Sequence, residues 1–176
     1  MKSLSRQIVL AVDLRPLSFG FAVFEGPDEL LDWGIKNFRH GKNAVKVPMN
    51  VKLAMLLDQH APDAVVMKKP RTAMLSRMVR TITALARVRR IPVRLISRTV
   101  VRSAFRDDNH NKYEIAKAIA VRFPELSPRL GHQRKLWEAE PYSTRIFDAA
   151  ALGLAHFTRN ATATSASNRA LWSVPR

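Results

Sequence analysis

Apolar residues fall into short β-branched runs and longer helical stripes, and the first half of this pattern predicts adjacent strands. Residues 8–13 (IVLAVD) are apolar on both faces, which is typical of a strand at the centre of a sheet. Residues 14–20 contain turn formers, and the apolar run at residues 21–24 completes a predicted hairpin. Residues 29–38 predict a third strand, with Gly34 as a candidate β-bulge.

The rest of the chain alternates helical and strand patterns. Helical spacing and bounding prolines predict helices over about residues 50–60, 72–90, 111–123 and 141–157, with strands over 63–67 and 93–97 and a loop over 124–140. An Asn-x-x-Glu pattern starting at Asn111 predicts an N-cap. Because antiparallel strands come first and strand–helix–strand crossovers follow, we expect an α/β fold. Its five-stranded sheet should be mixed, with the first three strands antiparallel and helices on both faces.

The length of 176 residues and the apolar content predict one domain. We expect this domain to span residues 1–159 and a disordered tail to span residues 160–176, which are small and polar. The chain contains no cysteine, which excludes a disulfide framework and cysteine-bound zinc. The apolar run near the N-terminus is short and ends in an aspartate, unlike a secretory signal or a membrane span. These features predict a cytoplasmic protein.

The charge balance narrows the class of partner. Thirty Lys and Arg face fourteen Asp and Glu, which gives a formal net charge of +16. Such a chain attracts polyanions, of which nucleic acid is the commonest and a membrane surface is the main alternative. A membrane-binding protein would concentrate its charge in an amphipathic helix or a polybasic end, whereas these arginines are spread through the predicted domain. The distribution therefore favours nucleic acid, with no membrane partner.

The predicted helix over residues 72–90 lies in a stretch with no acidic residue between Pro70 and Arg106. Helices usually balance such a face with acids, so the excess indicates phosphate contacts, although a solvated basic face is the alternative. The residues predicted to contact nucleic acid are Arg15, Lys69, Arg71, Arg77, Arg80, Arg87 and Arg90.

Two aspartates stand in otherwise apolar surroundings. Asp13 ends the first predicted strand, and a carboxylate there needs a partner because burying it alone is costly. Asp148 lies on a small, apolar face of the last predicted helix. The structural alternatives are a capping role for Asp13 in the following loop and a helical ion pair between Asp148 and Arg145. If the two carboxylates meet, they form an oxygen-ligand site suited to Mg²⁺, an ion that can support phosphodiester hydrolysis.

Three segments resemble the RuvC Holliday-junction resolvases of the RNase H-like superfamily: IVLAVDLRPLSFGFAVFEG, DAVVMKKP and RIFDAAALGLAH. The resemblance covers roughly residues 7–157 in element order. It implies an RNase H-like fold in which Asp13 and Asp148 are the first and last catalytic carboxylates. It also implies a Mg²⁺- or Mn²⁺-dependent endonuclease acting on branched DNA, and a homodimer.

The departures from this family concern the same site. Lys68 stands where the family has a catalytic Glu, with Lys69 as the alternative register, and Arg145 stands where the family has Asp or His. Protonated cations repel Mg²⁺ and cannot ligate it. Lys68 is therefore a candidate catalytic cation that pairs with Asp13 or holds a phosphate.

Two glutamates before the last predicted helix, Glu138 and Glu140, are candidate substitute ligands. Of these, Glu140 joins Asp13 and Asp148 in the predicted metal set, although a solvated loop is the simpler interpretation of both glutamates. With cations at two of the family's ligand positions, Mg²⁺ or Mn²⁺ is expected to bind weakly or not at all.

Three functions remain open. The first is a weak or altered Mg²⁺-dependent endonuclease on branched or structured DNA. The second is a nucleic-acid-binding pseudo-nuclease, and the third is an RNA-binding or RNA-processing protein on the same fold. Fold alone does not choose among these three functions. The family resemblance favours DNA over RNA as the partner.

Overall fold

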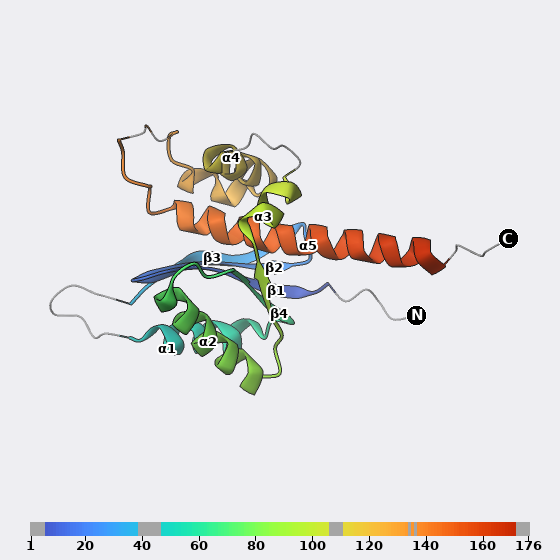
Figure 1. Ribbon diagram of the computed structural model, residues 1–176. Coiled ribbons are helices and arrows are strands. Elements are labelled where there is room, and N and C mark those ends of the chain that lie inside the picture. Colours follow the sequence, from blue (N-terminus) through green and yellow to red (C-terminus); the bar gives the residue numbers. More distant parts are fainter. Residues whose placement is uncertain (1–5, 39–46, 106–110, 134, 136, 172–176) are drawn as a thin grey trace.

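The computed structural model describes residues 6–38, 47–105, 111–133, 135 and 137–171, the last nine of these by backbone only (Figure 1). The strands are β1 (Ile8–Arg15), β2 (Ser18–Glu25), β3 (Glu29–Asn37), β4 (Ala64–Lys68) and β5 (Val93–Ile96). The helices are α1 (Met49–His60), α2 (Ala73–Val88), α3 (Arg98–Ala104), α4 (Lys112–Arg122), the 3₁₀ helix η1 (Pro124–Arg129) and α5 (Thr144–Leu171). The strands form one sheet in the order β3-β2-β1-β4-β5, antiparallel across β1, β2 and β3 and parallel across β1, β4 and β5. The predicted mixed five-stranded fold is confirmed.

Helices cover both faces of the sheet, with α1 and α2 on one side and α3, α4 and α5 on the other (Figure 1). The alternation of side chains along β1 decides which residues meet which layer. Leu10, Val12 and Leu14 pack in one core with α1 and α2, whereas Val9 and Ala11 pack in another with α5. Asp13 shares the parity of the second set, so its side chain belongs to the α5 face.

Small residues allow α5 to lie close against the sheet. A Cβ atom added at Gly20 on β2 would come within 2.2 Å of the carbonyl oxygen of Arg145. A Cβ atom added at Gly153 on α5 would come within 2.5 Å of the Phe24 ring. Because Gly20 is the cross-strand partner of Asp13, this contact brings the start of α5 over the end of β1 where Asp13 lies.

Several element boundaries differ from those predicted. Strand β2 begins at Ser18 rather than residue 21, since only Pro16 and Leu17 are needed for the turn. Helix α3 was not predicted, and the expected loop over residues 124–140 contains η1.

The predicted start and end of the last helix are wrong. Helix α5 starts at Thr144, not residue 141, and continues to Leu171 instead of ending near residue 157. Residues 160–171 contain neither Gly nor Pro, so nothing in this segment breaks the helix. The domain boundary at residue 159 stays a prediction, and residues 172–176 lie outside the described part of the chain. Across the described residues, no helix has the length and apolarity needed to cross a bilayer.

Candidate functional site

The site is built around Asp13, whose position follows from the strand that carries it. Strand β1 lies between β2 and β4, and the Asp13 residue is only 2% exposed. A buried carboxylate must be compensated. Its compensation comes from Arg15, two residues further along the same strand and therefore on the same face.

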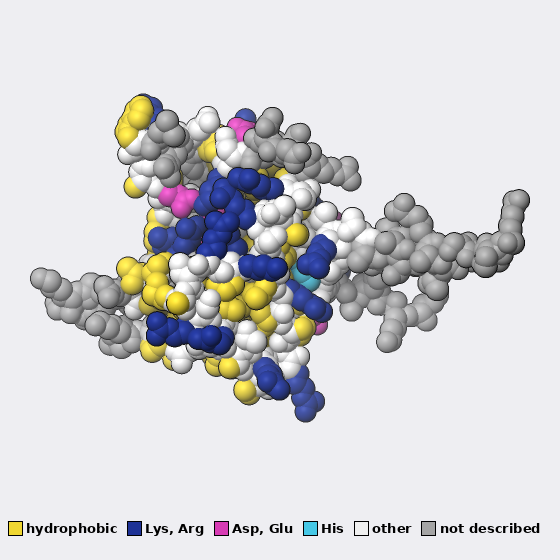
Figure 2. Space-filling model, in the orientation of Figure 1, with side chains coloured by type: hydrophobic (Ala, Val, Ile, Leu, Met, Phe, Trp, Pro, Cys, Tyr) yellow, Lys and Arg dark blue, Asp and Glu magenta, His cyan; other side chains and the backbone are white. Residues whose placement is uncertain are grey.

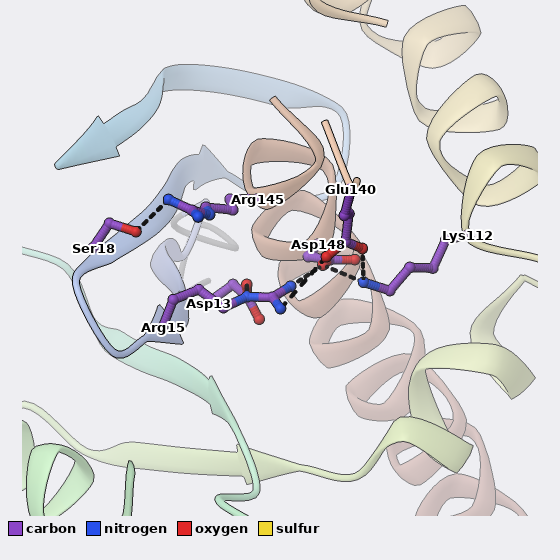
Figure 3. Close-up of polar contacts among 7 residues, drawn as sticks. All are labelled: Asp13, Arg15, Ser18, Lys112, Glu140, Arg145 and Asp148. Atoms are coloured by element: carbon purple, nitrogen blue, oxygen red, sulfur yellow. Dashed lines mark hydrogen bonds and ion pairs between the residues drawn. The ribbon is translucent and has the colours of Figure 1, made fainter. Parts of the chain in front are cut away.

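Arg15 joins the two aspartates identified in the sequence (Figure 3). Its Nε donates to Oδ2 of Asp13 at 2.8 Å, and its Nη2 donates to Oδ2 of Asp148 at 2.8 Å. Its Nη1 lies 3.6 Å from Oε2 of Glu140. A single guanidinium group therefore lies between carboxylates from β1 and α5, with the third carboxylate close by.

A second cation, Lys112, joins the outer two carboxylates. Lys112 is the first residue of α4, a helix capped by Asn111, whose side chain accepts from the backbone N–H of Glu114 as predicted. The Lys112 ammonium bonds Glu140 and lies 3.0 Å from Oδ2 of Asp148 (Figure 3). Asp13, Arg15, Asp148, Lys112 and Glu140 thus alternate in charge, and we call them the carboxylate–cation cluster.

Strand register identifies the lysine that faces this cluster. The parallel pairing of β1 with β4 places Val12 opposite Met67, so Lys68 comes next to Asp13. Lys68 also lies in the cavity that contains Asp13 and Asp148, and its charge lowers the pKa of Asp13. Lys69 does not line that cavity but lines an adjoining one, which Asp13 and Lys68 also line. Of the two candidates, Lys68 is therefore the one beside the carboxylates.

Arg145 does not form the helical ion pair considered as an alternative for Asp148. Its Nη1 donates to Oγ of Ser18 at 2.5 Å, and its guanidinium carbon lies 4.4 Å from the centre of the Tyr142 ring. Glu138 lies outside the cluster, where its carboxylate contacts Nε2 of His132 at 3.0 Å and accepts from the backbone N–H of Lys135. Among the candidate acids, only Asp13, Asp148 and Glu140 are brought together.

The protonation tendencies follow from burial and these pairs. Burial raises the pKa of Asp13, the charge of Asp148 raises it further, and Arg15 and Lys68 oppose both effects without cancelling them. Burial alone would lower the pKa of Lys112, but Asp148 and Glu140 outweigh it and raise that pKa. Lys112 therefore stays charged, as does Arg15.

The cluster does not fit a two-metal site in this arrangement. Metal ions bind carboxylate oxygens, yet Oδ2 of Asp13, Oδ2 of Asp148 and both oxygens of Glu140 are already paired with Arg15 or Lys112. Within the described residues, no group of three or more His, Asp or Glu is arranged to hold an ion. The ligand roles expected for Asp13, Asp148 and Glu140 stay predictions, and each would require these cations to move.

Three adjoining cavities form a groove that passes over the cluster. The middle cavity shares Asp13 and Lys68 with a second cavity toward α2, and shares Lys112 with a third toward the residue 130–141 loop. Figure 2 shows Lys and Arg side chains gathered on this face between the two helical layers. We call it the basic groove, and its cationic lining is Arg15, Lys68, Lys69, Arg71, Arg98, Arg102, Lys112 and Lys135.

The predicted nucleic-acid contacts divide into two sets. Arg15, Lys69 and Arg71 line the groove. Arg77, Arg80, Arg87 and Arg90 are exposed along α2 and just beyond it, and they line none of the three cavities.

Sequence reasoning missed Arg98, Arg102 and Lys112 as groove residues. Arg98 and Arg102 lie four residues apart on α3, a spacing that puts both on one helix face. That spacing was a usable signal for the two arginines. Lys112 carried none, because its role depends on where α4 packs.

Solved structures with similar architecture identify the fold. RuvC of Thermus thermophilus in complex with a Holliday junction substrate is similar with a TM-score of 0.64 at 15% identity, over 89% of this chain and 96% of that one. Thermus thermophilus RuvC in another structure gives 0.64 at 16%, over 89% and 97%. The chain has a RuvC-like fold.

The yeast mitochondrial Holliday junction resolvase Ydc2 is also similar, with a TM-score of 0.53 at 16% identity, over 88% of this chain and 78% of that one. No protein-family model matches the sequence, and no curated protein matches it. The RuvC-like fold expected from the sequence motifs is confirmed, and the roles of individual residues rest on the geometry described above.

Proposed function

We propose that this RuvC-like protein binds branched or structured DNA along the basic groove. The observation that carries the proposal is that three cations of the groove have no side-chain partner among the described residues. Lys68, Arg98 and Arg102 form no hydrogen bond or ion pair through their side chains with any described residue. Unpaired cations along a continuous groove attract phosphates and supply salt-dependent affinity.

The fold comparison supports DNA as the polyanion. One of the similar RuvC structures is solved in complex with a Holliday junction substrate. Extending that ligand class to this chain favours branched DNA over RNA, and the net charge of +16 supports either polyanion. The homodimer implied by the family resemblance stays a prediction that light scattering can test.

We further propose that the protein acts mainly as a binding protein, with Mg²⁺-dependent cleavage weak or absent. The carboxylate–cation cluster favours the pseudo-nuclease hypothesis over the endonuclease hypothesis. Arg15 lies between Asp13 and Asp148, and Lys112 lies between Asp148 and Glu140. A divalent ion could bind these carboxylates only by displacing Arg15 or Lys112, and the positive charge of these side chains also repels the ion. The carboxylates are therefore poorly available as ligands.

Binding is tested by fluorescence anisotropy with a four-way junction, a linear duplex of the same sequence and an RNA duplex, at several salt concentrations. We expect tightest binding to the junction, with affinity falling steeply as salt rises. Arg98→Glu combined with Arg102→Glu should weaken binding by at least about tenfold and reduce the salt slope by roughly two. Tighter binding of RNA than of both DNA probes would favour the RNA hypothesis.

The α2 pair provides the matched comparison, because Arg80→Glu with Arg87→Glu makes the same charge change outside the groove. If phosphates also run along α2, this variant lowers the affinity by a smaller factor. A larger loss from the α2 pair than from the α3 pair would place the main footprint on α2. Gel assays of the same junction with Mg²⁺ or Mn²⁺ test cleavage, and rapid metal-dependent cutting by the wild type would overturn the binding-only hypothesis.

A further inference from the structure

The middle cavity of the basic groove has a composition that phosphate binding alone does not explain. It lies among α3, α4 and α5 and has a volume of about 160 Å³. Its apolar lining comes from three helices: Val101, Ile115, Phe147, Ala151 and Leu152.

Cations stand beside these apolar walls. Lys68 comes from the end of β4, Arg98 and Arg102 come from α3, and Lys112 comes from the start of α4. Lys112 is engaged by Asp148 and Glu140, which leaves the other three for an incoming anion. The cavity therefore combines an apolar interior with positive charge, and its complement is a molecule with a flat apolar part joined to a phosphate.

We propose that this cavity accepts a single unstacked nucleotide of the bound DNA. The base lies against the walls formed by Val101, Ile115 and Phe147, and the adjoining phosphate is bound by Arg98 and Arg102. This inference rests on the proposed function, because the nucleotide belongs to the DNA held in the groove. Unpaired nucleotides at branch points and bulges supply such a group at the lowest cost, since their bases are already free of a partner.

Simpler occupants leave part of the cavity unexplained. A phosphate alone would satisfy the arginines and leave the partly exposed side chains of Val101 and Ile115 in water. A stacked base pair presents its edges and backbone rather than a base face, so it gains nothing from those walls. Base stacking on apolar and aromatic side chains is largely independent of sequence, so the cavity should accept all four bases.

The test compares two DNA hairpins that differ at one position. One carries a single bulged nucleotide, and the other carries an abasic site at the same bulge. Wild-type protein should bind the bulged nucleotide about tenfold more tightly, as expected for stacking of one base. Val101→Trp fills the cavity and should remove this preference, so that the variant binds the bulged and the abasic hairpin equally. Val121→Trp is the matched control, because Val121 is 76% exposed on α4 and lies outside the cavity.

A second measurement needs no variant and covers the case in which Val101→Trp fails to fold. Methyl NMR of the wild type is titrated with deoxyadenosine monophosphate and, separately, with deoxyribose 5-phosphate. The nucleotide should shift the methyl signals of Val101, Ile115 and Leu152, whereas the sugar phosphate should leave them unmoved.

The outcomes separate this inference from the proposed function. Equal affinity for the two hairpins, an intact preference in a folded Val101→Trp variant, or equal methyl shifts with both titrants would overturn the nucleotide cavity. In each of these cases, salt-dependent binding of both hairpins would leave the groove proposal intact. Failure to bind either hairpin would instead reject the proposed function itself.

Discussion

Arg15→Ala tests whether the protein uses its own cations in place of metal ions. The substitution removes the guanidinium that bonds Asp13 and Asp148 at 2.8 Å each. Asp13 would then be a buried carboxylate whose nearest compensating charge is that of Lys68. We therefore expect two effects: a loss of stability, and a new affinity for divalent ions.

The size of the stability loss follows from burial. Removing one partner of a fully buried ion pair costs roughly 3–5 kcal/mol, because the other charge is left uncompensated. The Asp13 side chain is 3% exposed, but the side chains of Arg15 and Asp148 are 29% and 19% exposed, so water screens part of the effect. We expect a loss near the lower limit, about 3 kcal/mol, which for a chain of this size lowers Tm by roughly 6–12 °C.

Divalent ions should recover part of this loss in the variant alone. An ion that binds only the folded state at ten times its Kd adds about 1.4 kcal/mol. The assay is thermal unfolding of four proteins, with and without 10 mM Mg²⁺ or Mn²⁺: wild type, Arg15→Ala, Lys68→Glu and the double variant. Lys68→Glu alone leaves Arg15 between the aspartates, so only the two proteins that lack Arg15 should gain Tm, and the double variant should gain most.

Two results would refute this reasoning. A divalent-induced rise in the Tm of wild type as large as that of Arg15→Ala would show that ions enter the cluster with Arg15 present. An Arg15→Ala variant as stable as wild type, and unaffected by ions, would show that Arg15 does not compensate the aspartates. Arg122→Ala is the control, because it removes an exposed pair with Asp28 and should change Tm little in either buffer.

Three further predictions concern the same face of the sheet. Burial and Asp148 raise the pKa of Asp13 above its ordinary value of 3.8, so ionisation of Asp13 costs stability. In chemical unfolding, the difference in free energy of unfolding between wild type and Asp13→Asn should therefore favour wild type most below pH 3.8 and shrink as pH rises. A difference that grows with pH would show that Arg15 outweighs burial. Gly20→Ala should destabilise the fold by roughly 1–3 kcal/mol or more, because its Cβ would meet the Arg145 carbonyl, whereas Gly131→Ala, whose nearest neighbour is Pro141 Cγ at 3.9 Å, should be tolerated; equal unfolding midpoints would contradict the close packing of α5. In junction-cleavage assays, Lys68→Glu should create or raise Mn²⁺-dependent activity chiefly when Arg15 is also replaced, and Asp13→Asn should abolish that activity. Robust cleavage by wild type that is lost in Lys68→Glu would instead make Lys68 a catalytic cation.

The sequence was informative wherever local pattern and position coincide. The apolar run over residues 8–13 predicted a central strand because a strand buried on both faces must be apolar throughout. Asp13 and Asp148 stood out because each interrupts an apolar surface, and the structure brings both to one guanidinium. The fold and the two central carboxylates were therefore accessible from the chain alone.

The partners of these carboxylates were harder to predict. Arg15 was expected to contact nucleic acid, although the two-residue period of a strand places it on the face of Asp13, so its role in the cluster was within reach of the pattern. The role of Lys112 could not be predicted in this way, because Lys112 and Asp148 lie 36 positions apart in the chain and meet only where α4 packs on α5. Helix α3 escaped notice because it spans only seven residues and buries none of them.

The origin of the cations distinguishes this cluster from a metal site in physical terms. Three carboxylates held together repel one another, and some positive charge must offset that repulsion. A metal ion does so only while its free concentration exceeds its Kd, whereas Arg15 and Lys112 are covalently attached and cannot dissociate. On the proposed function, the groove therefore keeps its charge at any metal concentration. Tethered cations also cannot generate the metal-bound hydroxide that hydrolysis of this type requires. On the proposed function, tethered cations take the place of metal ions and thereby remove the means of metal-assisted cleavage, which is the combination expected of a protein that holds DNA without cutting it.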